Sequence, residues 1–138
     1  MHFTLYADGG SRGNPGPAGA GSFVRDEEGV RVVTVSEFLG TTTNNIAEYT
    51  ALLRALEELR TLLGTAASLA IVDARLDSQL VVRQMNGEYK IKHPNIIPLA
   101  AKVKEVARAF KSVSFTHVYR EDNKEADALA NEAMDRGH

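Results

Sequence analysis

Four acidic residues stand where the sequence pattern places strand ends or the first turns of helices. Asp8 follows the alternating run 3–7, and Asp77 follows a second apolar run typical of a strand. Glu48 lies early in a leucine-rich helical pattern, beside its apolar face, where a carboxylate is costly unless a positive group compensates it. Asp127 lies in the first turn of the last predicted helix. If the two strands are neighbours in a sheet, the side chains of Asp8 and Asp77 lie side by side at one edge.

Carboxylates gathered in this way would have a particular chemistry. They repel one another and raise one another's pKa values unless cations join them. Ligation by oxygen atoms alone suits Mg²⁺ or Mn²⁺ rather than Zn²⁺. Two such ions about 4 Å apart can activate water, stabilise a leaving oxygen and hold a phosphate between them. Hydrolysis of a phosphodiester is therefore the reaction that this set of residues favours.

Most of these acidic residues also have a purely structural interpretation. Asp8 precedes two glycines and is a common turn former. Asp77 could cap the short helix that the pattern predicts next, and Asp127 is favoured near a helix N-terminus by the helix dipole. Glu48 has no equally simple structural explanation. The spacing alone leaves these alternatives open.

The order of predicted elements indicates a mixed α/β domain with one sheet, spanning residues 1–138. We expect strands at 3–7, 22–25, 30–38, 69–76 and 112–119, and helices at 44–63, 78–85, 96–110 and from about 123. Thr43 or Asn44 is available to cap the helix at 44–63, and Gly64 to end it. The glycine- and proline-rich stretch 9–21 should connect the first two strands. The first three strands should form an antiparallel meander, and helical crossovers should join the parallel part.

Composition narrows the class of protein further. The 138 residues carry a formal net charge of −2 and no cysteine, which excludes disulfides, thiolate metal sites and a cysteine nucleophile. The chain shows neither a long apolar run nor a basic leader, so we expect a monomeric, cytoplasmic protein with no membrane partner. Its net charge gives no indication of a nucleic-acid partner. The segment GNPGPAGAG after the first strand suggests a phosphate loop only weakly, because it lacks the Walker lysine and a following helix.

Four ordered motifs carry a resemblance to a known family. They are YADGGSRGNPGPAGAG at 6–21, TTTNNIAEYTAL at 41–52, DSQLVV at 77–82 and REDNKEADALANEA at 120–133. From Leu5 to about Met134 the sequence resembles type 1 ribonuclease H. The resemblance implies a five-stranded mixed sheet, with three antiparallel strands and then two parallel ones, flanked by helices. It also implies an endonuclease that hydrolyses the RNA strand of RNA/DNA hybrids with two Mg²⁺ ions, Mn²⁺ being the other candidate metal.

The same resemblance gives a role to each site residue. Asp8 would bridge both metal ions. Glu48 and Asp77 would hold the ion on the leaving-group side, and Asp127 the ion that activates water. Amide side chains would read 2′-hydroxyls and base edges in the minor groove, Thr43 would help to hold a DNA phosphate, and backbone amides of the loop 9–13 would contact the RNA. The substrate-binding residues implied in this way are Gly9, Gly10, Ser11, Asn14, Thr43, Asn44, Asn45 and Gln79, with turn and cap chemistry as the alternative for the asparagines.

One departure from the family pattern concerns the group that assists catalysis. Members with a mobile loop histidine before the last aspartate use it in proton transfer or product release. His117 has suitable spacing but falls inside a predicted strand, where histidine is more often structural. Arg120 begins the following loop and can hold a phosphate as a bidentate donor, so we favour Arg120 over His117 for this role.

Other departures concern the substrate. The basic handle helix that some members use to bind hybrids is missing, and Tyr89 is the only aromatic residue in that stretch that could contact the DNA strand. Weak affinity with a steep salt dependence is the expected result. Thr41 occupies a place where an arginine often supports the DNA phosphate site, so preference for a DNA partner strand is less firmly implied. A catalytically inactive nucleic-acid-binding module and a nuclease for double-stranded RNA are the alternative functions.

Overall fold

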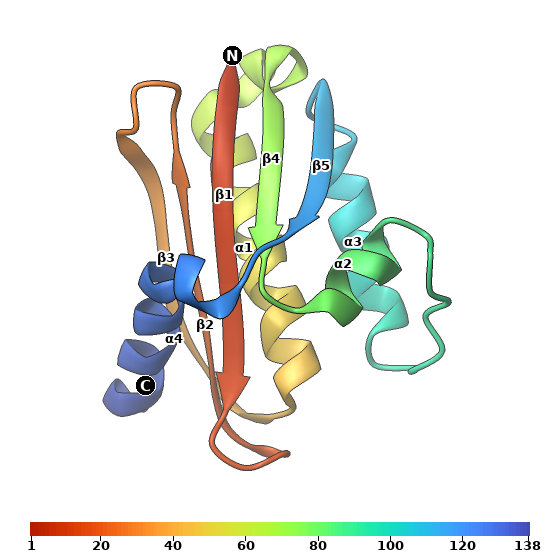
Figure 1. The fold of residues 1–138 in the computed structure, drawn as a ribbon. Helices are drawn as coiled ribbons and strands as arrows, with labels where there is room; N and C mark the ends of the chain where they lie inside the picture. Colours follow the sequence, from red (N-terminus) through yellow and green to blue (C-terminus); the bar gives the residue numbers. More distant parts are fainter.

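The computed structural model describes residues 1–138 as one five-stranded sheet with helices on both faces (Figure 1). The strands are β1 (His2–Ser11), β2 (Gly16–Arg25), β3 (Arg31–Thr42), β4 (Ile71–Leu76) and β5 (Ser112–His117). The helices are α1 (Asn44–Leu63), α2 (Gln79–Met85), α3 (Ile97–Ala107) and α4 (Lys124–Arg136), and two 3₁₀ turns are η1 (Gly64–Leu69) and η2 (Arg120–Asp122). None of these helices has the length and apolar character needed to cross a lipid bilayer.

The strand order in the sheet is β3-β2-β1-β4-β5, with β1 at the centre. β1 pairs antiparallel with β2, and β2 with β3. β4 runs parallel to β1, and β5 parallel to β4, because helical crossovers return the chain to the same end of the sheet each time. The fold class predicted from the sequence, three antiparallel strands followed by two parallel ones, is therefore confirmed.

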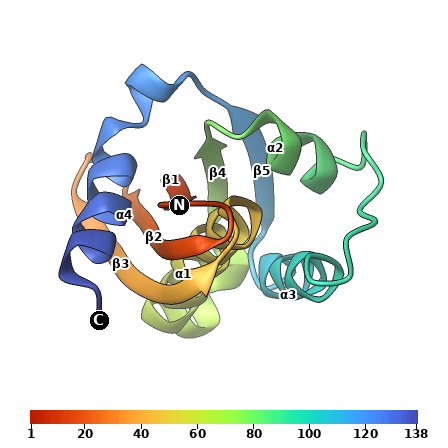
Figure 2. The ribbon, with the colours of Figure 1, turned by 90° about the horizontal axis from the view of Figure 1, so that it is seen from below.

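The helix α1 supplies the main apolar layer on one face of the sheet. Thr43, one of the two predicted N-cap residues, accepts a hydrogen bond from the N–H of Ile46 through its side chain. Gly64 is the C-cap, as predicted. α3 packs beside α1, whereas α4 covers β1, β2 and β3 from the opposite face (Figure 2). The fully buried side chains between α1 and the sheet include Leu5, Leu52, Leu56, Leu59 and Val72.

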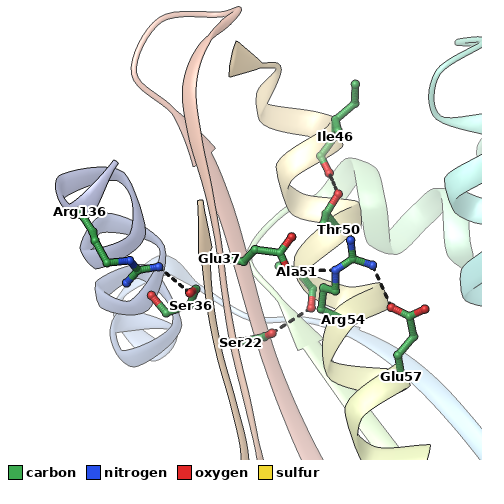
Figure 3. Close-up of polar contacts among 9 residues, drawn as sticks. All are labelled: Ser22, Ser36, Glu37, Ile46, Thr50, Ala51, Arg54, Glu57 and Arg136. Carbon is green, nitrogen blue, oxygen red and sulfur yellow. Dashed lines mark hydrogen bonds and ion pairs between the residues drawn. The ribbon is translucent and has the colours of Figure 1, made fainter. Parts of the chain in front are cut away.

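Polar contacts fix α1 and α4 to the antiparallel part of the sheet (Figure 3). The buried hydroxyl of Ser22 in β2 donates to the carbonyl oxygen of Ala51 in α1 at 2.9 Å. Arg54 of α1 forms an ion pair with a glutamate of β3 at 3.0 Å. On the other face, the guanidinium of Arg136 in α4 donates to the carbonyl oxygen of Ser36 at 2.9 Å. Each helix is thus held by directional contacts as well as by apolar packing.

Two glycines let the helices approach the sheet closely. A Cβ atom at Gly9 would lie 2.2 Å from the carbonyl carbon of Ala47 in α1, and one at Gly21 would lie 2.2 Å from the carbonyl oxygen of Ala126 in α4. Any larger residue would have to displace helix backbone. The small residues in the stretch 9–21 therefore serve the packing of both helices and not only the connection of two strands.

The predicted limits of several elements were wrong. β1 does not end at Asp8 but continues to Ser11, and β2 begins at Gly16, so only residues 12–15 form the turn. Glycine, alanine and proline have little intrinsic preference for strands, so the pattern gives no strand signal there, and pairing with neighbouring strands decides the conformation instead. The strand predicted at 69–76 begins at Ile71, after η1, and the strand predicted at 112–119 ends at His117.

Candidate active site

A pocket of about 290 Å³ brings together the four acidic residues that the sequence singled out. They come from β1, α1, the residue after β4, and α4. The pocket is predominantly polar, and its lining residues are Asp8, Gly9, Gly10, Asn44, Glu48, Asp77, Ser78, Arg120, Asp127, Ala130 and Met134.

Sheet register places Asp8 beside Asp77. The parallel pairing of β1 with β4 ends at Ala7 opposite Leu76. Asp8 and Asp77 are the next residues of their chains, so both carboxylates leave the sheet at the same level. β1 continues beyond this point and pairs with β2 alone, because β4 has ended. A notch is left beside the extended half of β1, and we call it the β4 notch.

The β4 notch lets side chains from both faces of the sheet meet. The residue pair Asp8 and Gly21 faces α4, whereas Gly9 faces α1. Glu48 belongs to α1, and its backbone nitrogen lies close to Gly9, on the α1 face of the sheet. Its side chain nevertheless lines the same pocket as Asp8. A continued β4 would fill the space through which the Glu48 carboxylate reaches the other three.

The last helix is tied directly to the strand that carries Asp8. Asn123 is almost fully buried, and its side-chain amide donates to the carbonyl oxygen of Ala7 at 3.0 Å. The carbonyl oxygen of Asn123 in turn accepts the N–H of Asp127 at 3.0 Å. The start of α4 is therefore attached to Ala7, the residue directly before Asp8. Asp127 lines the pocket from the first turn of this helix.

Crowding of carboxylates changes their acidity. Burial raises the pKa of Asp8 to about 8, with further increases from Asp77, from contact with the carboxyl group of Asp127, and from Glu48. Burial also raises the pKa of Glu48 to about 7; the hydroxyl of Ser78, which hydrogen bonds to this carboxylate, lowers the pKa, and Asp77 raises it. Without a cation, the pocket is therefore an unfavourable place for negative charge.

The donor set fits a hard divalent cation. The Oε2 atom of Glu48 is buried and has no hydrogen-bond partner, and none of the four carboxylates forms an ion pair. As they lie in this structure, no three acidic or histidine side chains are close enough together to hold a metal ion. A cation would supply the partner that Glu48 lacks and would draw the repelling carboxylates inward. The residues present are thus suited to Mg²⁺ or Mn²⁺.

Several residues proposed to bind substrate form one connected group around the turn 12–15. Gly9, Gly10 and Asn44 line the pocket. The Oδ1 atom of Asn44 accepts from the N–H of Ser11 at 2.7 Å and from its hydroxyl at 3.0 Å, and the N–H of Asn44 donates to the side chain of Asn14 at 3.2 Å. Asn14 and Asn44 therefore have the structural role that was the alternative interpretation for the asparagines. Contrary to the loop predicted at 9–13, Gly9, Gly10 and Ser11 belong to β1.

Of the remaining predicted residues, only Arg120 lines the pocket. Thr43 caps α1, whereas Asn45 and Gln79 are exposed at the starts of α1 and α2. Arg120 lines the pocket, but His117 does not; its ring makes an edge contact with Tyr119, with ring centroids 5.8 Å apart. Of the two residues considered for the assisting role, Arg120 is therefore the one that lies at the pocket.

Sequence reasoning missed Ser78 and Met134. Ser78, not Asp77, is the N-cap of α2, because its hydroxyl oxygen accepts the N–H of Val81 at 3.2 Å. Asp77 is thereby free to face the pocket. A serine directly before a helical run is a cap signal that could have identified this residue. Met134 lies two turns after Asp127 on α4 and contacts the pocket only because α4 packs against Gly10 and Gly19, which the sequence does not show.

Comparison with known proteins gives one consistent group of relatives. Residues 6–133 match the family model described as reverse transcriptase-like. A ribonuclease H1 isolated from compost is 45% identical, with 98% of this chain and 96% of that chain covered and a TM-score of 0.91. The ribonuclease H1 of the archaeon Halobacterium salinarum is 39% identical, with 99% of each chain covered and a TM-score of 0.88.

Longer relatives and a substrate complex add two further findings. A bifunctional protein of Mycobacterium tuberculosis is 41% identical over 98% of this chain, but the chain spans only 36% of that relative's length. The compost enzyme has also been solved in complex with an RNA/DNA hybrid, in a structure 44% identical to this chain over 97% of both chains, with a TM-score of 0.91. The similarity thus extends over nearly the whole of the residues described here.

Proposed function

This chain belongs to the type 1 ribonuclease H family, and on that premise we propose that it is an endonuclease that hydrolyses the RNA strand of RNA/DNA hybrids. The solved complex of the compost relative with an RNA/DNA hybrid supports the choice of substrate. The observation that carries the proposal is the convergence of four acidic side chains, none paired with a cationic group, in one pocket beside Arg120.

In this proposal the four carboxylates hold two Mg²⁺ ions. Bound there, the ions supply an activated water molecule and neutralise the charge that develops on the phosphate and the leaving oxygen. Asp8 is suited to contact both ions because the other three carboxyl groups all influence its pKa. Asp77 also raises the pKa of Glu48, so these two residues would share one side of Asp8, and Asp127 would lie on the other. These ligands are Asp8, Glu48, Asp77 and Asp127.

Other side chains would orient the substrate. The guanidinium of Arg120 lies at the pocket and can hold a phosphate oxygen of the cleaved strand by charge-assisted hydrogen bonds. Gln79 and Asn45 follow the lining residues Ser78 and Asn44 in the chain, and Asn14 is hydrogen bonded to Asn44, so these amides would recognise 2′-hydroxyls and base edges. Every proposed ligand comes from one chain, so the proposed active unit is a monomer.

Cleavage of matched substrates tests this function. The wild-type protein and Asp8→Asn would be compared on an RNA/DNA hybrid, an RNA duplex and a DNA duplex with Mg²⁺ or Mn²⁺. We expect the wild type to cut the RNA strand of the hybrid and the variant to lose at least about a hundredfold in rate, because a shared metal ligand is removed. Equal activity in the variant would exclude the assigned site. Cleavage of the RNA duplex in preference to the hybrid would instead support the alternative substrate.

A further inference from the structure

The carboxylate of Asp127 is held by a residue outside the pocket. Asn131 lies four residues later on the same face of α4. Its side-chain amide nitrogen donates to the Oδ2 atom of Asp127 at 3.3 Å and to the carbonyl oxygen of the same residue at 3.1 Å. Asn131 does not line the pocket. It therefore contacts the proposed metal ligand Asp127 from outside the pocket.

This contact matters because no basic side chain holds the carboxylate of Asp127. The residue is exposed, and it forms no ion pair with an arginine or lysine. A free aspartate on a helix surface populates more than one side-chain rotamer. A hydrogen bond to Oδ2 restricts these rotamers and does not involve Oδ1. Restriction before binding reduces the conformational entropy that binding must remove.

A second contact fixes which way the amide of Asn131 points. The guanidinium of Arg12, in the turn between β1 and β2, forms an ion pair with Asp135 at 2.6 Å and reaches the Oδ1 atom of Asn131 at 3.5 Å. The oxygen of the amide therefore faces a cation, and its nitrogen faces the Asp127 carboxylate. This arrangement determines the amide orientation, because the reversed amide would present its N–H groups to Arg12 and its oxygen to a carboxylate.

We propose that Asn131 is a positioning residue that holds the carboxylate of Asp127 for a divalent cation, with Arg12 orienting the amide of Asn131. The inference rests on the proposed function, because it presupposes that Asp127 is a metal ligand. Hydrogen-bond partners of metal-ligating carboxylates orient the ligand, and their loss lowers metal affinity or activity by about 10- to 100-fold. Arg12 acts one step further away, so its removal has a smaller effect.

The test measures metal binding as well as activity. Titration calorimetry with Mn²⁺ would compare the wild type with Asn131→Ala and Arg12→Ala. Glu132→Gln is the matched control, because Glu132 is an exposed neighbour on α4 that contacts only Arg136, at 4.0 Å. We expect Asn131→Ala to bind Mn²⁺ about tenfold more weakly, Arg12→Ala about threefold more weakly, and Glu132→Gln as tightly as the wild type. The melting temperature of metal-free Asn131→Ala should stay close to that of the wild type, because alanine is a good helix former at an exposed position.

A double-substituted protein separates positioning from a general structural role. If Asn131 acts through Asp127, then Asn131→Ala should cause no further loss of Mn²⁺ affinity in a protein that already carries Asp127→Asn. Wild-type Mn²⁺ affinity in Asn131→Ala, while Asp8→Asn loses binding, would overturn the inference and leave the proposed function intact. Wild-type Mn²⁺ binding by Asp8→Asn would overturn the metal site itself, and the proposed function with it.

Discussion

The buried carboxyl group of Asp8 makes the stability of the metal-free protein depend on pH. Its pKa rises from 3.8 to about 8 on folding, so between these values the folded protein keeps a proton that the unfolded chain releases. The free energy of unfolding therefore falls as the pH rises from about 4 to about 8. Glu48 adds to the decline up to about pH 7.

Replacement of Asp8 tests this dependence. Asp8→Asn should make the metal-free protein more stable than the wild type at pH 8, on the order of 2 kcal/mol after allowance for the partial exposure of the site, and the gain should vanish near pH 4. Urea unfolding with a chelator at both pH values measures it. The exposed residue Asp122 offers the control Asp122→Asn, which removes one acidic charge outside the pocket. A destabilised Asp8→Asn at both pH values would contradict the electrostatic account.

Arg120 and His117 are separated by kinetic measurement. Arg120→Ala should lower kcat on a hybrid by about 10- to 100-fold, because a charged donor at the phosphate is lost from the pocket. His117→Ala should change kcat by less than about threefold, since its ring contacts Tyr119 and not the pocket. Substitution effects of the opposite order would show that the β5 end moves into the site during turnover.

At the scale of elements, the sequence predicted helices better than the glycine-rich strands. The regular leucine spacing, the Thr43 cap and the Gly64 end defined α1 correctly, since these signals are local. The strand β2 gave no such signal at Gly19 and Gly21, where small residues are required by contact with α4. That requirement comes from a helix more than a hundred residues later, so no local pattern reveals it.

The close approach of α1 to β1 can be tested with adjacent glycines. Gly9→Ala should destabilise the protein by at least about 2 kcal/mol, because the new methyl group would meet α1 backbone at 2.2 Å. At Gly10 the nearest atom is the flexible end of Met134, 3.8 Å away, so Gly10→Ala should cost less than about 1 kcal/mol. Urea unfolding of both variants provides the comparison. Equal stabilities would mean that α1 shifts without cost.

At the scale of the whole molecule, the candidate site was easier to predict as a list of residues than as a geometry. Glu48 and Asp127 lie early in helices and Asp77 directly follows an apolar strand, and such positions can be read from the sequence. The β4 notch could not be predicted, because it depends on how many residues β1 extends beyond the end of β4. The contacts of Asn123 and Asn131 were also hidden, since they follow from the docking of α4.

The overall charge of −2 sets an expectation for substrate affinity. Arg120 is the only basic residue that lines the pocket, so binding should be weak, and the phosphate contacts that exist should still be screened by salt. The KM for a hybrid, measured at fixed Mg²⁺, should rise by more than about tenfold between 50 and 200 mM KCl. A KM insensitive to salt would indicate that apolar or amide contacts dominate binding.

The meeting of β1 and α4 at one pocket has a consequence for biosynthesis. The strand that carries Asp8 leaves the ribosome well before the helix that carries Asp127. A nascent polypeptide with α4 still inside the exit tunnel would possess only three of the four proposed metal ligands. The proposed cleavage of hybrids would therefore begin only after α4 has emerged and docked.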